Sequence, residues 1–178
     1  MCSSDLVTRL VHREVPTDEN GYFIAKDGLN KLAVIERHHE TGHVGVGIVD
    51  GLHVQNGAIA ATVSHDSHNI VIVGDNDPDM LLAAETLKAC GGGFAVVSGG
   101  EIKALLELPV AGLMSDAPVE TVLEKQRALL DAARALGTSD ECDPLILLSF
   151  LALPVIPEVR LTDCGLFDVT TMSFLYRN

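Results

Sequence analysis

The six residues 64–69 (SHDSHN) carry the densest set of reactive side chains in the sequence. Two imidazoles, a carboxylate, two hydroxyls and an amide lie between two apolar runs, 57–63 and 70–74, that are typical of buried strands. Loops held by a rigid scaffold carry a large share of binding and catalytic residues. The candidate substrate loop therefore consists of His65, Asp66, Ser67, His68 and Asn69.

Two chemical interpretations of this loop stay open. The spacing of His65 and His68 would let both imidazoles approach one metal ion, with Asp66 as a third ligand or as a group that orients a histidine. Alternatively, both histidines hydrogen-bond the backbone and cap the turn, because a pair of histidines alone is a weak metal signal. A serine nucleophile needs a base and an acid that converge in space, which sequence neighbours rarely achieve.

Three further polar groups each have a structural and a functional interpretation. Residues 36–39 (ERHH) end a segment, 28–38, whose apolar spacing predicts a short helix, so Arg37 and His38 either interact with the helix dipole or face a ligand and the histidine-containing loop. Residues 75–79 (DNDPD) either cap a helix, with Asp77 as the N-cap, or bind a hard cation. Residues 154–158 (PVIPE) either stop a helix or aim Glu158 at a site.

The elements needed to position these groups follow from hydrophobic periodicity and from Gly and Pro. Strands are predicted at 44–49, 57–63 and 70–74, and a hairpin at 94–108; helices are predicted from 77, over 119–136 and from 144. The glycines at 45 and 47 indicate a close backbone approach or a bulge. We expect an α/β or α+β fold, a single domain with a mixed β-sheet packed with about three to four helices. Residues 1–28 form a polar segment that could add an edge strand at 6–11, and residues 29–178 form the folded domain.

Composition excludes several classes of function. The chain has 178 residues, of which 47% are hydrophobic, which is enough for one core, and the net charge is −13. Such a surface repels phosphate backbones, so we expect no nucleic-acid partner. The longest apolar stretch is too short to span a bilayer and no signal peptide is evident, so we expect no membrane partner and a cytoplasmic location. Walker, G-x-G-x-x-G and small zinc-deaminase signatures are missing, as is any His-x-His pair.

Six segments, taken together and in order, resemble the C-terminal domain of bacterial-type adenine deaminases, which belong to the amidohydrolase superfamily. They are 32–38 (LAVIERH), 57–60 (GAIA), 65–69 (HDSHN), 112–116 (GLMSD), 149–158 (SFLALPVIPE) and 161–169 (LTDCGLFDV). The resemblance implies a hydrolase that converts adenine to hypoxanthine and ammonia with a metal-activated water. The metal, manganese, iron or zinc, would be held by an amino-terminal barrel that begins with a His-x-His motif.

This chain has neither the length of a barrel nor that motif, so the resemblance implies an accessory domain or subunit without the main metal centre. It assigns no catalytic residue to this chain and no cofactor to the chain alone. The expected partners are the amidohydrolase barrel, adenine and further copies of the chain in a homo-oligomer. The alternatives are a non-catalytic module for purine binding or oligomerisation, and an independent metal hydrolase built on His65 and His68.

Overall fold

The computed structural model describes residues 6–177, which are built around a six-stranded sheet. Its strands are β1 (Leu29–Ile35), β2 (Val44–Asp50), β3 (Ala58–Ala61), β4 (Ile70–Gly74), β5 (Gly93–Ser98) and β6 (Glu101–Glu107). They lie in the order β2-β1-β4-β3-β5-β6, and every neighbouring pair is antiparallel. The predicted class is confirmed in its α+β form, with an antiparallel sheet where a mixed one was expected.

Three hairpins, β1–β2, β3–β4 and β5–β6, supply the six strands. The loop 62–69 joins the strands of the middle hairpin, so it leaves the sheet at its centre. Helix α1 (Asp77–Ala89) connects β4 to β5. Because both of these strands run antiparallel to β3, they point in the same direction with β3 between them.

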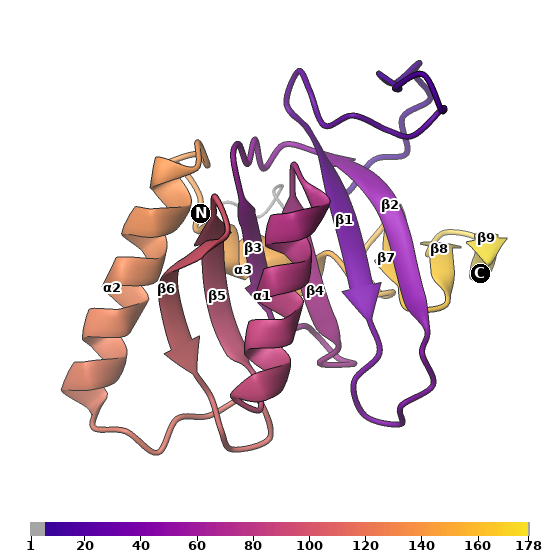
Figure 1. Cartoon of the computed structure of the whole chain (residues 1–178). Helices are drawn as coiled ribbons and strands as arrows, with labels where there is room; N and C mark the ends of the chain where they lie inside the picture. The colour runs from indigo at the N-terminus through magenta and orange to yellow at the C-terminus, as the bar shows by residue number, and fades with distance from the viewer. Residues whose placement is uncertain (1–5, 178) are drawn as a thin grey trace.

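Helices cover both faces of the sheet (Figure 1). Helix α1 packs on one face over a cluster that includes Ala60, Ile72 and Leu87. Helices α2 (Val119–Ala135) and α3 (Pro144–Phe150) pack on the other face over a larger cluster that includes Val71 and Leu148. None of the helices in the described part of the chain is long and apolar enough to cross a membrane.

The segment predicted as a short helix over 28–38 is strand β1, so that prediction is wrong. Its apolar residues are spaced as on a helix, but the strand is covered on both faces. Leu32 and Val34 enter the larger core cluster, whereas Ala33 and Ile35 face the α1 side. A strand buried on both sides is apolar at successive positions, and a short run of this kind does not distinguish strand from helix.

A second sheet of β7 (Val159–Thr162), β8 (Gly165–Asp168) and β9 (Ser173–Arg177) packs against β2. The predicted close approach at the glycines of β2 is confirmed. A Cβ atom at Gly45 would lie 1.9 Å from the carbonyl oxygen of Thr162, whereas one at Gly47 would lie 3.4 Å from a methyl group of Leu161. The absence of a side chain at Gly45 therefore lets the β7–β8 hairpin reach the start of β2.

Where an edge strand was considered, at 6–11, the N-terminal segment makes an isolated bridge between Thr8 and Glu158. The guanidinium of Arg160, whose residue is 2% exposed, donates to the carbonyl oxygens of Phe150 at 3.0 Å, Ile156 at 2.8 Å and Leu6. Arg160 thus ties this segment to the end of α3. Residues 1–5 of the predicted segment lie outside the described residues.

Replacing Gly45 by alanine should destabilise the domain, because the new methyl group would overlap backbone that cannot rotate away. We expect the free energy of unfolding in urea to fall by about 1–3 kcal/mol. Gly47→Ala is the matched control on the same face of the same strand, and its change should stay within about 1 kcal/mol. Equal losses in the two variants would show that the contact with Thr162 is not what requires glycine.

Candidate functional site

The candidate loop lies at the end of the sheet where β1 ends, β2 and β4 begin, and β3 ends (Figure 1). The connection 36–43 between β1 and β2 and the turn between β7 and β8 reach the same end. Ala111, in the segment between β6 and α2, reaches it as well through a contact with Arg37. Several of the segments that resemble adenine deaminases, far apart in the sequence, thus meet here.

Arg37 holds two of these segments together. Its Nε donates to the carbonyl oxygen of His68 at 2.6 Å, and its Nη2 donates to that of Ala111 at 2.8 Å. Gly112 allows this approach, because a Cβ atom there would lie 2.7 Å from Nη2. Arg37 follows a strand and no helix, so the helix-dipole interpretation does not apply, and its role here is to position the loop.

The loop is also anchored on its other sides. The backbone N–H of His65 donates to the carbonyl oxygen of Ser149 in α3 at 2.9 Å. The His65 ring lies 4.8 Å from that of Phe150, centroid to centroid. His38 Nε2 is 2.8 Å from the carbonyl oxygen of Ser67. The structure therefore brings Arg37 and His38 against the loop, while Asp66 and Ser67 are exposed at its tip.

Some buried polar atoms of the loop make no hydrogen bond within the described residues. Ser64 Oγ, His68 Nδ1 and Asn69 Oδ1 are buried and have no hydrogen-bond partner among residues 6–177. A buried polar atom without a partner costs about 1–3 kcal/mol, and such atoms concentrate where a structure serves a function or holds a water molecule.

The pKa of His68 is also lower than the ordinary value of a histidine. Burial lowers the pKa of its imidazole. Electrostatic repulsion from His65, Arg37 and His38 lowers that pKa further, because positive charge near the ring disfavours its protonated form. The carboxylate of Asp66 opposes this effect. The ring is therefore held in its neutral form, which can both donate and accept a hydrogen bond.

His65, Asp66 and His68 do not gather into a metal site. The two imidazole centroids are 6.2 Å apart, and within residues 6–177 the group of three donor atoms close enough for one ion consists of other residues. The loop also lines neither a cavity of about 340 Å³ beside β6 and α2 nor a cavity of about 930 Å³ that borders β2. Only the tip of the loop, at Asp66 and Ser67, is exposed, and within the described residues His65, Asp66 and His68 do not supply three ligands to one ion.

Glu36 organises the connection that carries Arg37 and His38. Its side chain is 7% exposed. Its carboxylate accepts the backbone N–H groups of His38, His39 and Thr41 and the Thr41 hydroxyl. Burial alone would raise the pKa of Glu36, but these donors outweigh it and hold the pKa at about 2.

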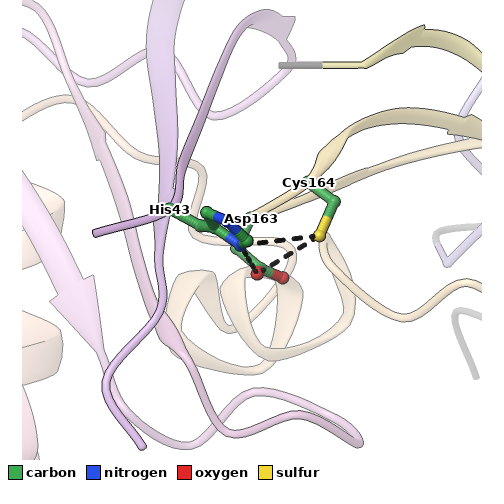
Figure 2. Close-up of side chains that lie close together, drawn as sticks. All are labelled: His43, Asp163 and Cys164. Atoms are coloured by element: carbon green, nitrogen blue, oxygen red, sulfur yellow. Dashed lines mark hydrogen bonds and ion pairs between the residues drawn. The ribbon is translucent and has the colours of Figure 1, made fainter. Parts of the chain in front are cut away.

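A group that the sequence did not single out lies beside the loop (Figure 2). His43 Nδ1 is 3.7 Å from Asp163 Oδ2 and 4.0 Å from Cys164 Sγ, and that sulfur is 3.5 Å from Asp163 Oδ2. Burial and the Asp163 carboxylate raise the pKa of the Cys164 thiol. Without a bound ion, Cys164 is therefore a protonated thiol and a poor nucleophile.

The remaining polar groups have structural roles in the described chain. Asn76, and not the predicted Asp77, caps α1 by accepting the N–H of Asp79 at 2.9 Å. The carboxylate of Asp79 in turn accepts from the backbone N–H groups of Gly99 and Gly100. Glu158 accepts the N–H of Leu10. Capping and backbone anchoring therefore account for the contacts of these groups.

Glu36→Gln should destabilise the chain at pH 7, because an amide group replaces one of the accepting oxygens. The native carboxylate has a pKa of about 2, below its ordinary value of 4.5. Its contribution is therefore complete above pH 4.5 and is lost as the pH falls towards 2. Urea unfolding at several pH values should show a difference from the native chain that shrinks over this range. Glu40→Gln, an exposed position in the same connection, is the control; a pH-independent difference would contradict this account.

Comparison with known proteins gives a consistent result. The model of the family described as adenine deaminase C-terminal domain matches residues 5–173. The adenine deaminase of Nitratidesulfovibrio vulgaris strain DP4 is 54% identical over 170 residues, which cover 95% of this chain and 30% of that protein. Adenine deaminase 2 of Carboxydothermus hydrogenoformans is 50% identical over 94% of this chain and 30% of its own length.

The adenine deaminase of Halalkalibacterium halodurans is 49% identical over 96% of this chain and 29% of its own length. The chain thus spans about three tenths of the length of the curated relatives it matches. In those relatives the matching region is one part of a larger hydrolase. The chain belongs to the adenine deaminase C-terminal domain family.

Proposed function

We propose that this chain acts as the C-terminal part of a metal-dependent adenine deaminase, and that its candidate loop forms part of the surface that faces the catalytic barrel and the bound adenine. The observation that carries the proposal is the convergence of the segments at the loop end of the sheet, where Arg37 donates to carbonyl oxygens of two other segments, at His68 and Ala111. Membership of the family supports the reaction, the hydrolysis of adenine to hypoxanthine and ammonia.

The loop has the chemistry expected of such a surface. Asp66 and Ser67 are exposed and His65 is partly exposed, so a carboxylate, a hydroxyl and an imidazole are presented outwards. The contacts with Arg37, His38 and Ser149 hold the backbone beneath them in place. A preorganised loop loses less conformational entropy when it meets a second domain or a ligand.

The loop lacks two features that the deamination of adenine requires, so we infer that another part of the enzyme supplies them. A metal ion supplies an activated water by lowering its pKa, and the loop does not gather the ligands for that ion. Binding of a small planar base also requires an enclosed pocket, which the projecting loop does not form by itself. We infer that a second surface closes the pocket, while His65 and Asp66 orient the purine or exclude water from it.

The test uses a chimaera in which this chain replaces the matching C-terminal region of the Nitratidesulfovibrio vulgaris enzyme. His65→Ala and Asp66→Asn in the chimaera should each lower kcat/KM for ammonia release from adenine by about tenfold, roughly 1.4 kcal/mol of transition-state stabilisation. The melting temperature should change little for Asp66→Asn, whose side chain is exposed, and should fall slightly for His65→Ala, which also loses its ring contact with Phe150.

His12→Ala, which alters an exposed histidine in the N-terminal segment, is the matched control and should leave kcat/KM unchanged. If the loop variants keep full activity, the functional role of the loop is wrong. If they lose activity only in proportion to a loss of thermal stability, His65 and Asp66 serve the fold and not the reaction.

A further inference from the structure

The group of His43, Asp163 and Cys164 joins two parts of the fold that are distant in sequence (Figure 2). His43 immediately precedes β2, and Asp163 and Cys164 form the turn between β7 and β8. The three donor atoms, a nitrogen, an oxygen and a sulfur, all lie within 4.8 Å of one another. These are the three atom types that bind zinc in proteins.

The backbone on both sides of the group is held in place. The carbonyl oxygen of His43 accepts from the N–H of Glu36 at 3.0 Å, and its own N–H donates to Thr41 Oγ1 at 3.2 Å. The N–H of Cys164 donates to Thr162 Oγ1 at 3.2 Å. The close approach at Gly45 brings these two backbones together.

The carboxylate of Asp163 is oriented by a neighbour. Asn69 Nδ2 donates to Asp163 Oδ1 at 3.2 Å, while Oδ2 is the oxygen close to both His43 and Cys164. A polar neighbour that binds one oxygen of a carboxylate and leaves the other for an ion is a common arrangement around metal ligands.

We propose that His43 Nδ1, Asp163 Oδ2 and Cys164 Sγ bind one Zn²⁺ ion, with a water molecule as the fourth ligand. Tetrahedral bonds of about 2.0–2.3 Å place donor atoms about 3.3–3.6 Å apart. The separations of 3.5, 3.7 and 4.0 Å therefore need to contract by only a few tenths of an ångström. The His43 side chain is 57% exposed, which leaves its ring free to make this adjustment and leaves room for the water.

Binding replaces the thiol proton by the metal. The Cys164 S–H bond breaks, the proton passes to solvent, and the thiolate sulfur donates its electron pair to Zn²⁺, with no change of oxidation state. The ion would cross-link the β1–β2 connection to the β7–β8 turn and stabilise the docking of the second sheet. This inference does not depend on whether the chain takes part in deamination.

The experiment is a Zn²⁺ titration of the purified, chelator-treated chain, followed by calorimetry and by the melting temperature. We expect one Zn²⁺ per chain and a rise in melting temperature on binding. Substitution with Co²⁺ should give a thiolate-to-metal charge-transfer band, which reports the bond to sulfur directly.

Cys164→Ser should remove this band and weaken Zn²⁺ binding at least tenfold, and His43→Ala, an exposed position that the fold tolerates, should weaken binding to a similar degree. The matched controls are Cys90→Ser, a half-buried thiol elsewhere, and His39→Ala, an exposed histidine of the same connection; both should bind as the native chain does. Absence of stoichiometric binding, or undiminished binding in either ligand variant, overturns the proposal.

Discussion

The constraint on which the rest of the structure depends is the burial of the central strands on both faces. Every residue of β3 and β4 is buried, with α1 on one side and α2 and α3 on the other. Small residues such as Ala58, Ala60 and Ala95 line the α1 side, which lets that helix pack close to the sheet. Both strands are short, so the loop between them begins at the edge of the core and has little freedom to move.

Arginine side chains fix the loops that surround this core. Arg37 donates to carbonyl oxygens of two loops at one end of the sheet, and Arg160 donates to carbonyl oxygens of Leu6, Phe150 and Ile156. A buried guanidinium is stable only when its donors are satisfied, and backbone carbonyls of irregular segments need donors as well. One cation therefore resolves both requirements and gives irregular segments a defined position.

Polar groups at the loop end of the sheet form one connected surface. Glu36 orders the connection that carries Arg37, His38 and His43, and Asn69 links the candidate loop to Asp163. The hydrogen bond between Asn69 and Asp163 links the loop to the second sheet. A change at the His43 group and a change in the loop therefore both affect this contact.

The sequence by itself determined the helices and strands in which apolar residues recur at regular spacing. It also determined the family to which the chain belongs. The apolar runs around residues 64–69 predicted β3 and β4, and the regular apolar face over 119–136 predicted α2, because each pattern reports burial along a single element. The tertiary structure alone decided that β1 is a strand and that Arg37 fixes the loop. It also decided that His43 meets Cys164, 121 residues further along the chain. Such contacts depend on strand order and on close approaches such as that at Gly45, which local periodicity does not encode.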